Sequence, residues 1–435
     1  MRSEGGRMTI SATDRAAVGE WIRGAAHPLR TADPMAPLDD LRPLLAMVGE
    51  RTAVAGFGAG TRGARELLAL QARIARLLFA EADFRVLALD QDAALGAALD
   101  AWSRTGAGDV VALLQAAEPF SRTGETLALL RWLRALRRAR PEAAPRVVGV
   151  SPRETGAAAY DAVTAYVRRA APERLAELAS HYAELRPPGA VPDHTRRYQA
   201  LPDRRPWRER ARAAHDLVAA APGHEGHAWA RYQARLIVQY HALHDHGHDP
   251  LDPHNMDRYE RSFAENVLWW HRHTGHRVLF WSSSSHTARA PGRVVSFPPH
   301  PPGLSPNAGG HLHADLGDRY LSIGLTFGAG ELAPYTGAPH HRVPAPVPPL
   351  VESVLDGAGA GDFLLDLRQR APRRVAEWLA RDVTTRLVGP RHDPRRDPDH
   401  HMTGGSLAEW FDVLVHRRRV TPARPLGPAT PEATG

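Results

Sequence analysis

The sequence predicts an α/β fold in which helices flank a mainly parallel sheet. Short apolar runs at 54–57, 85–89 and 146–150 are typical of buried strands, and helical patterns lie between them. This alternation favours parallel neighbours, because a parallel connection needs a crossover that a helix usually supplies. The 435 residues are 43% hydrophobic and 24% charged, which is enough for a sizeable core in one or two domains.

The first expected strand runs into a glycine-rich turn, and an amphipathic helix follows at 64–81. The apolar residues Leu67, Leu70, Ile74, Leu77 and Leu78 share one face of this helix. Shorter helices are predicted at 14–23, 38–48 and 126–140.

The middle of the chain is predicted to be helical, and strands return after it. The expected helices are 157–185, 207–220, 229–244 and 257–273, with a loop at 187–206, and the expected later strands are 278–281, 320–327 and 411–415. We therefore expect an N-terminal arm (1–35), an α/β core in two parts (36–155 and 276–420), a helical subdomain (156–275) and a disordered tail (421–435).

The composition excludes several kinds of site. The chain has no cysteine, which excludes disulfides, thiolate metal sites and a cysteine nucleophile, and a cytoplasmic location is expected. No apolar run follows Arg2 and Arg7, and no stretch approaches the roughly 18 apolar residues of a membrane span, so we expect neither a signal peptide nor a membrane partner. The formal charge is +7, but the arginines alternate with Ala, Leu and Glu, as in 131–140. This favours solvated helix faces over a nucleic-acid surface.

Polar residues follow the carboxyl ends of the first three expected strands. The turn 59–63, Asp90 and Ser151 each come after a strand. In open α/β sheets ligands bind outside the carboxyl ends of the strands, so we expect these residues near one another. The start of the next helix supplies free N–H groups, which suits an anion near Arg62 and Arg65.

Four segments together resemble the erythromycin esterase family. Residues 54–66, VAGFGAGTRGARE, are similar to a strand, a G-E-x-T-H-G turn and a helix that opens with glutamate, and 84–90 to a strand that ends in an acid. Residues 264–289 contain AENVLWW and VLFWSSSSHTAR, similar to A-E-N-x-x-W and W-A-H-N-x-H. Residues 309–331 are similar to G-x-x-L, L-G-x-x-Y and F-G-x-G-E. The correspondence covers 40–420 and implies a helix-flanked α/β core with a helical subdomain over a deep cleft.

The family resembles metal-independent hydrolases in which a histidine deprotonates water, so the resemblance implies no metal and no cofactor. This chain departs from the family pattern at several positions. The turn glutamate falls on Ala59 and the turn histidine on Arg62. In W-A-H-N-x-H the first histidine and the asparagine fall on Ser283 and Ser284, whereas the last histidine is kept as His286.

These departures change the chemistry that the site can perform. A guanidinium cannot accept a proton in any usable range, so Arg62 cannot be the base. It can bind an anion or stabilise an oxyanion. The expected base is His286, with Asp90 or Glu66 as the acid that orients it, although His286 is alternatively structural and Glu66 alternatively a helix-capping residue. The candidate catalytic residues are His286, Asp90, Glu66 and Arg62.

A second group of residues is expected to contact the substrate. The serines after Trp281 can act as nucleophile or hydrogen-bond donors, or alternatively fill space and donate to the backbone. Trp281 is expected to line the pocket, and the resemblance places His311 near the cleft. The candidate substrate-binding residues are Arg65, Ser283, Ser284, Ser285, Trp281 and His311.

Two other patterns favour structural roles. The glycine run 56–63 lacks the ending of a phosphate loop and the dinucleotide spacing, so a nucleotide site is not expected. A histidine- and aspartate-rich stretch matches no ligand template for zinc or nickel, and a solvated helix end is favoured there. Its residues are His241, His244, Asp245, His246, His248, Asp249, Asp252 and His254.

The expected function is that of a tailoring enzyme of secondary metabolism, as in antibiotic biosynthesis or resistance. It would act on an ester, lactone or related acyl group of a large natural product, a small molecule such as a polyketide or a peptide, with non-standard catalytic residues. The alternatives are a non-catalytic ligand-binding pseudoenzyme and a true macrolide esterase.

Overall fold

The computed structural model describes residues 10–143, 145–245, 253–290, 292–298, 302–333, 339–389 and 392–427. Its centre is a nine-stranded sheet. The strands are β1 (His27–Pro28), β2 (Val54–Ala59), β3 (Phe84–Leu89), β4 (Arg146–Gly149), β5 (Arg277–Ser283), β8 (Tyr320–Leu332), β9 (His341–Val343), β10 (Phe363–Asp366) and β13 (Val413–Val420). The six strands β13, β8, β2, β5, β3 and β4 lie side by side in that order and run parallel, whereas β1, β9 and β10 pair antiparallel. The predicted mainly parallel α/β fold is confirmed.

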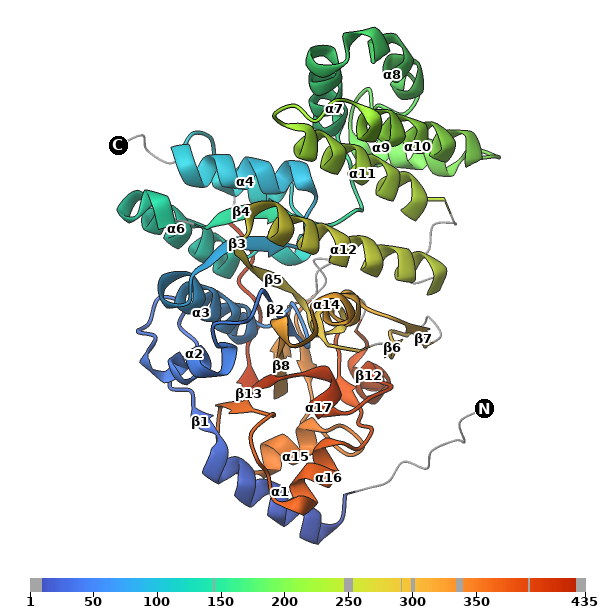
Figure 1. Cartoon of the computed structure of the whole chain (residues 1–435). Coiled ribbons are helices and arrows are strands. Elements are labelled where there is room, and N and C mark those ends of the chain that lie inside the picture. Colours follow the sequence, from blue (N-terminus) through green and yellow to red (C-terminus); the bar gives the residue numbers. More distant parts are fainter. Residues whose placement is uncertain are drawn as a thin grey trace.

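Helices cover both faces of this sheet, because side chains alternate between the faces along each strand. Phe57 and Leu279 belong to the core under one group of helices, whereas Val54 and Phe280 belong to the core on the opposite face. The first group is α2 (Pro43–Val48), α3 (Arg65–Glu81), α4 (Ala93–Thr105), α5 (Val110–Gln115) and α6 (Gly124–Ala139). The second face is covered by α12 (Pro253–Thr274) and α14 (Ala308–Leu316) (Figure 1).

A group of helices at one end of the molecule has an apolar core of its own, shown at the top of Figure 1. These helices are α7 (Ala157–Ala170), α8 (Leu175–Tyr182), α9 (Val191–Gln199), α10 (Arg205–Ala220) and α11 (His227–Leu243). The helix expected at 157–185 is two helices, since Pro172 interrupts it, and the expected loop at 187–206 contains α9. The helical subdomain is expected to extend to residue 275 and so to include α12. In the structure, α12 packs on the sheet.

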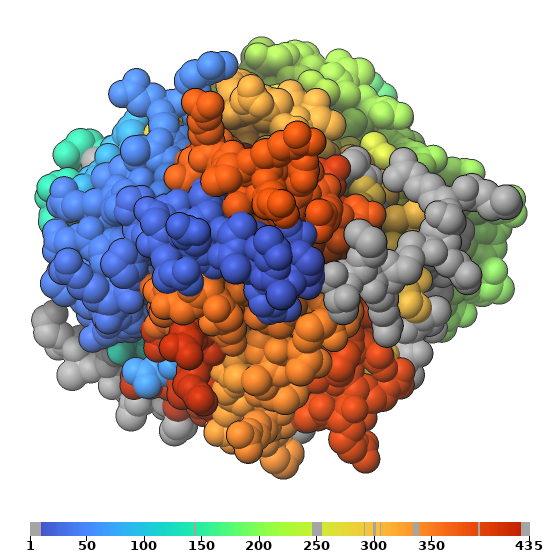
Figure 2. Space-filling model, turned by 90° about the horizontal axis from the view of Figure 1, so that it is seen from below, coloured from blue at the N-terminus to red at the C-terminus, as the bar shows by residue number. Residues whose placement is uncertain are grey.

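Smaller elements close the opposite end. The helix α1 (Ala12–Ala25) packs against α15 (Glu352–Gly357) and α16 (Arg373–Leu379). Figure 2 shows α1, in dark blue, lying across the orange C-terminal part of the chain. A second, antiparallel sheet contains β6 (Arg293–Ser296), β7 (Gly303–Ser305), β11 (Thr385–Arg386) and β12 (His401–Thr403), and the short helices are α13 (Ser284–Thr287) and α17 (Leu407–Trp410).

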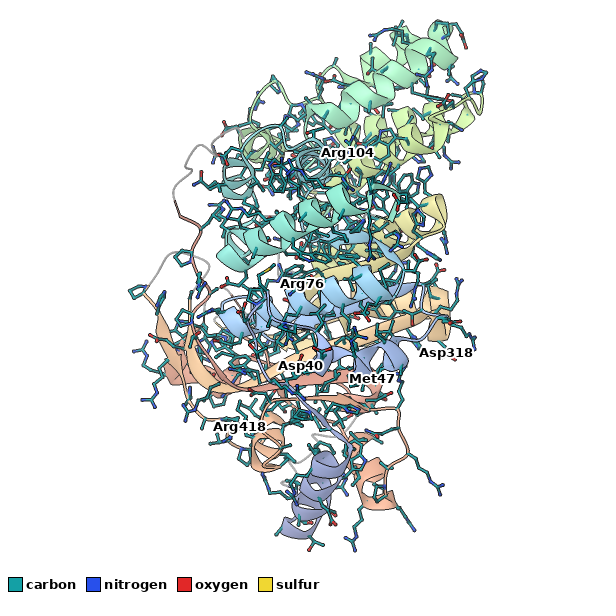
Figure 3. All side chains as sticks on the ribbon, turned by 90° about the vertical axis from the view of Figure 1, so that its left-hand side faces the viewer. Asp40, Met47, Arg76, Arg104, Asp318 and Arg418 are labelled. Carbon is teal, nitrogen blue, oxygen red and sulfur yellow. The ribbon has the colours of Figure 1, made fainter. Side chains whose placement is uncertain are left out.

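The segment before α2 is tied to α3 by a buried ion pair. Asp40, labelled in Figure 3, accepts a hydrogen bond from Arg73 at 2.6 Å, and both side chains are almost fully buried. Arg73 also donates to the backbone oxygens of Thr31 and Pro37. These bonds satisfy a buried charge, which would otherwise be costly. No helix in the described ranges has the length and apolar character needed to cross a membrane.

We call the segment 421–427 the strap. It is ordered, so the expectation of a disordered tail from residue 421 is wrong for this segment. Its backbone pairs with the turn after β2, with Ala423 donating to Gly63 and Arg65 donating to Thr421, both at 2.9 Å. It also pairs with the start of α6, where Gly124 donates to Arg424 at 2.9 Å. The strap therefore joins the turn that carries Arg62 to the start of α6. The last eight residues of the expected tail lie outside the described part.

We predict that Glu66→Gln destabilises the fold by about 1–3 kcal/mol, because the carboxylate of Glu66 holds the strap. Its two oxygens accept hydrogen bonds from the backbone N–H and the hydroxyl of Thr421, each at 2.6 Å. Urea denaturation measures the change in the free energy of unfolding. The matched control on the same helix is Glu81→Gln, because Glu81 forms a more exposed pair with Arg42. Equal effects of the two substitutions would contradict this role.

Candidate active site

Three polar side chains meet at the carboxyl ends of β2, β3 and β5. β5 lies between β2 and β3 and is parallel to both, so the residues after these strands converge. Nη2 of Arg62 donates to Oδ2 of Asp90 at 2.6 Å and to Oγ of Ser282 at 2.8 Å. The sequence predicts Arg62 and Asp90 at one crevice, and the structure joins them in an ion pair.

Asp90 is buried and ionised. Its side chain is only 3% exposed, and its second carboxylate oxygen accepts a hydrogen bond from the hydroxyl of Tyr259 at 2.9 Å. Burial alone would raise the pKa of Asp90, but the charges of Arg62, Arg153 and His286 outweigh burial and hold this pKa well below its usual value. Asp90 therefore serves as a fixed negative charge and does not exchange protons near neutral pH.

Two aromatic rings cover the arginines of the site. The guanidinium of Arg62 lies 3.8 Å from the ring centroid of Phe120, and that of Arg153 lies 4.8 Å from the ring centroid of Tyr259. Arg153 also forms an ion pair with Glu118 at 3.4 Å. Burial raises the pKa of the Tyr259 phenol well above its usual value. The charge of Arg153 opposes this rise, and the charge of Asp90 adds to it. The hydroxyl of Tyr259 thus remains a hydrogen-bond donor.

His286 is oriented by Glu260. Nδ1 of His286 lies 2.8 Å from Oε1 of Glu260, a fully buried residue of α12. The same oxygen accepts a hydrogen bond from Arg293. Its other oxygen accepts the backbone N–H of Ala308 at 2.8 Å. Burial would raise the pKa of Glu260, but His286 and Arg293 outweigh it and lower the pKa below its usual value. The expectation that Asp90 or Glu66 orients His286 is therefore wrong, because the carboxylate on Nδ1 is that of Glu260.

The bond to Glu260 also sets the tautomer of His286. An ionised carboxylate only accepts hydrogen bonds, so Nδ1 carries the hydrogen, and in the neutral form of the ring Nε2 keeps its lone pair. The imidazole is 12% exposed, and its ring centroid lies 5.7 Å from that of Tyr259, whose hydroxyl binds Asp90. Tyr259 thus links the two pairs, because its ring lies against His286 and its hydroxyl binds Asp90.

Glycines in β2 allow the helix α13, which carries His286, to lie against the sheet. A Cβ at Gly58 would be 2.1 Å from Oγ1 of Thr287 and 2.6 Å from the backbone of Ser283. A Cβ at Gly56 would be 2.2 Å from the hydroxyl of Tyr320. The first half of the glycine run therefore provides room for close packing.

The three candidate serines lie in α13 and just before it, with local partners. Oγ of Ser284 donates to the backbone oxygen of Gly58 at 2.8 Å, and the hydroxyls of Ser283 and Ser285 lie 2.7 Å apart. The serine that reaches the ion pair is Ser282, which the sequence pattern did not single out. Ser284 therefore makes the backbone bond of the alternative role, whereas Ser283 and Ser285 bond to each other.

A pocket opens beside the Arg62–Asp90 pair. It is a small cavity of about 30 Å³, room for about one water molecule, and Trp281 and Ser282 line it together with the ion pair. Nε1 of Trp281 donates to Gln71 at 2.9 Å, which fixes the indole in the wall. His286 is not among the residues that line this pocket.

The other candidate residues lie elsewhere. Both carboxylate oxygens of Glu66 accept hydrogen bonds from Thr421. Arg65 lies near Glu125, and its positive charge opposes the rise in the pKa of Glu125 that burial causes. His311 faces α12, and burial lowers its pKa, as does nearby Arg261. None of these three lines the pocket.

The expected histidine-rich stretch lies only partly in the described residues. His241 is buried, and its Nε2 lies 3.3 Å from the hydroxyl of Tyr160, whereas Nε2 of His244 lies 2.8 Å from the backbone oxygen of Arg153. Residues 246–252 lie outside the described ranges. Within those ranges no group of three or more histidine or acidic side chains is arranged to hold a metal ion.

Tyr259 and Glu260 are site residues that the sequence analysis missed, although a signal was present. Glu260 precedes Phe263, Ala264 and Val267 at helical spacing, and all four are buried on α12. A glutamate within an apolar helix stripe indicates a buried, paired charge, because an unpaired one would be too costly.

We predict that the protein loses stability below about pH 4 and that Asp90→Asn weakens this loss. The pKa values of Asp90 and Glu260 are lowered from 3.8 and 4.5, so both stabilise the fold above these values, and that stability is lost as the pH falls through the lowered values. Near pH 7, Asp90→Asn costs about 3–5 kcal/mol, because it leaves Arg62 buried without its partner. Unfolding free energies in urea at several pH values measure both effects.

The control is Asp161→Asn, because Asp161 pairs with Arg186 on the surface. An acid-induced loss in Asp90→Asn as large as in the unaltered protein would contradict a lowered pKa at this carboxylate.

Comparisons with known proteins agree with this architecture. A Bacillus cereus protein shares 23% identity with a TM-score of 0.81, covering 94% of this chain and 99% of its own. A succinoglycan biosynthesis protein shares 22% identity with a TM-score of 0.80, and the match covers 96% of this chain and 100% of that one. A mutant erythromycin esterase in an open conformation shares 14% identity with a TM-score of 0.66, and the match covers 91% of this chain and 98% of that one. A search of curated proteins finds no match. The erythromycin esterase family model matches residues 79–420, and the chain therefore belongs to that family.

Proposed function

We propose that the protein is a hydrolase-like enzyme that acts on an ester or lactone of a small natural product, with His286 as the general base. The observation that carries this proposal is the Glu260–His286 pair beside the Arg62–Asp90 pair. Family membership supports acyl chemistry at this end of the sheet. A role in tailoring or inactivating a secondary metabolite is part of the proposal.

In the proposed reaction, Nε2 of His286 takes a proton from water while the water oxygen bonds to the carbonyl carbon. A fixed Nδ1–H, held by the ionised Glu260, leaves Nε2 able to accept that proton and stabilises the imidazolium that forms. The tetrahedral intermediate then collapses, the bond to the leaving oxygen breaks, and His286 returns the proton to the leaving alcohol.

Arg62 has a different role from the histidine that the family pattern places in this turn. Its guanidinium stabilises the negative charge that develops on the carbonyl oxygen, and Asp90 holds it in position. Because the charge of Asp90 lies 2.6 Å from Nη2, the ground-state pair is close to neutral. A neutral carbonyl therefore suits this position better than the anionic group that the sequence suggests for Arg62.

A non-catalytic binding protein is the second candidate. The observation that favours it is the replacement of the turn histidine by Arg62, whose charge Asp90 already compensates. Such a protein would bind a natural product at the carboxyl ends of these strands and release it unchanged.

We predict that His286→Ala lowers the rate of hydrolysis by about 10²–10⁴-fold, because the general base is lost. Glu260→Gln lowers the rate by a similar factor, because the amide no longer fixes the tautomer of His286. Mass spectrometry after incubation with a panel of esters, lactones and macrolides detects products heavier by one water. The control is His271→Ala, since His271 lies at the other end of α12 and binds the backbone of His276.

Three outcomes separate the candidates. Hydrolysis that survives His286→Ala would remove His286 from the mechanism. Binding of panel compounds without any product would favour the non-catalytic protein. Products from macrolides alone would identify a macrolide esterase.

A further inference from the structure

The carboxylate that orients His286 also binds a buried arginine. Arg293 lies on β6, its side chain is only 2% exposed, and it donates to Oε1 of Glu260, the same oxygen that faces Nδ1 of His286. The second oxygen of Glu260 accepts the backbone N–H of Ala308 at 2.8 Å. A single buried negative charge therefore serves both His286 and Arg293.

Arg293 also binds the backbone next to His286. Its Nε donates to the backbone oxygen of Ser285 at 2.5 Å, and Nδ2 of Asn307 donates to the same oxygen at 2.9 Å. Ser285 directly precedes His286 in α13. One guanidinium thus contacts both the helix that carries the imidazole and the carboxylate that orients it, because its planar fork presents several donors in fixed directions.

The imidazole of His286 is surrounded by charged and titratable groups from several elements. In the described part of the chain, the groups that face it are Glu260 and Tyr259 on α12, Arg293 on β6 and Asp90 after β3. Tyr259 is uncharged, since burial raises the pKa of its phenol well above the usual value. Arg153, which lies over the ring of Tyr259, forms its own ion pair with Glu118.

The remaining four charges form two pairs. Glu260 pairs with Arg293, and Asp90 pairs with Arg62. Because these charges sum to zero, a neutral imidazole completes a set without net charge, whereas an imidazolium adds a positive charge in a poorly solvated place. Without Arg293, Glu260 would keep an unpaired buried charge, and a protonated His286 would be the group that compensates it.

We infer that Arg293 is a positioning residue for His286: it supplies the positive charge that Glu260 would otherwise take from a protonated imidazole, and so keeps Nε2 free to accept a proton. The inference deepens the proposed function and rests on it for the use of His286 as the base. A histidine bound to a carboxylate alone would hold its proton too tightly to serve as a base at mildly acidic pH. Arg293 extends the working range downward, because a guanidinium keeps its own proton.

Nitrogen-15 NMR of the full chain tests this inference, because the shifts of the ring nitrogens report the protonation and the tautomer of each histidine. The signals of His286 are assigned by their absence from His286→Ala. Arg293→Gln removes the charge but keeps a group that can donate to Glu260. In this variant the pH at which His286 takes up its proton is expected to rise by about 1–2 units. No rise would overturn the inference.

Two further variants separate the charge of Arg293 from its packing. Arg293→Lys keeps the charge, so His286 is expected to take up its proton near the same pH as in the unaltered chain. Arg73→Gln is the matched control, because Arg73 forms an equally buried pair with Asp40 on the opposite face of the sheet from α12. A rise in either variant as large as in Arg293→Gln would contradict an effect of this particular charge.

Glu260→Gln is the complementary change, and it decides the question if Arg293→Gln does not fold. It leaves the charge of Arg293 without its partner, so His286 is expected to take up its proton at a pH lower by about 1–2 units. The double variant removes both charges, and the pH of protonation is expected to return toward that of the unaltered chain. A shift to higher pH in Glu260→Gln would overturn the inference.

Failure of the inference and failure of the proposed function are distinguishable, since the NMR measurement does not depend on turnover. The expected shifts without hydrolysis of any ester by the unaltered chain would support the role of Arg293 and contradict the enzyme. Hydrolysis whose acid limb of kcat/KM moves to higher pH in Arg293→Gln, together with the NMR signal, would support both. Hydrolysis with an unmoved acid limb would support the enzyme and overturn the inference.

Discussion

The site depends on one buried ion pair, Arg62–Asp90. Two charges that are 10% and 3% exposed are stabilised by each other, with Ser282 and Tyr259 completing the hydrogen bonds of Asp90. The pair joins three parallel strand ends and α12, so it connects the two faces of the sheet. It also decides the electrostatics of this end of the sheet, because Asp90 compensates the charge of Arg62.

The rest of the molecule holds that pair and its histidine neighbour in place. The strap fixes the turn that carries Arg62 from one side, through Glu66 and the backbone of Gly63. Glycines in β2 let α13 approach the sheet closely enough for His286 to reach Glu260. Rigid strands and a short helix thus present the reacting groups, and the positions are set by close packing rather than by long loops.

The fold could be predicted because strand and helix periodicity are local properties. The strands at 54–57 and 146–150 and the helix at 64–81 are present within a few residues of the expected bounds. Asp90 and Arg62 could be placed together because parallel strands end at one edge. Glu260 could not be paired with His286 from sequence, because the pair joins two helices and depends on how α12 crosses the sheet. The strap likewise depends on backbone pairing across more than three hundred residues, as the bond from the N–H of Arg65 to the backbone oxygen of Thr421 shows.

A double-mutant cycle on the free energy of unfolding tests the central claim most directly. Arg62→Met and Asp90→Asn each leave a buried group without its partner, whereas the double variant removes the pair as a whole. If the two side chains form the buried pair that organises the site, the double variant loses about 2 kcal/mol less than the sum of the single losses. Additive losses, within about 0.5 kcal/mol, would contradict the account, because they would show that the guanidinium and the carboxylate do not depend on each other.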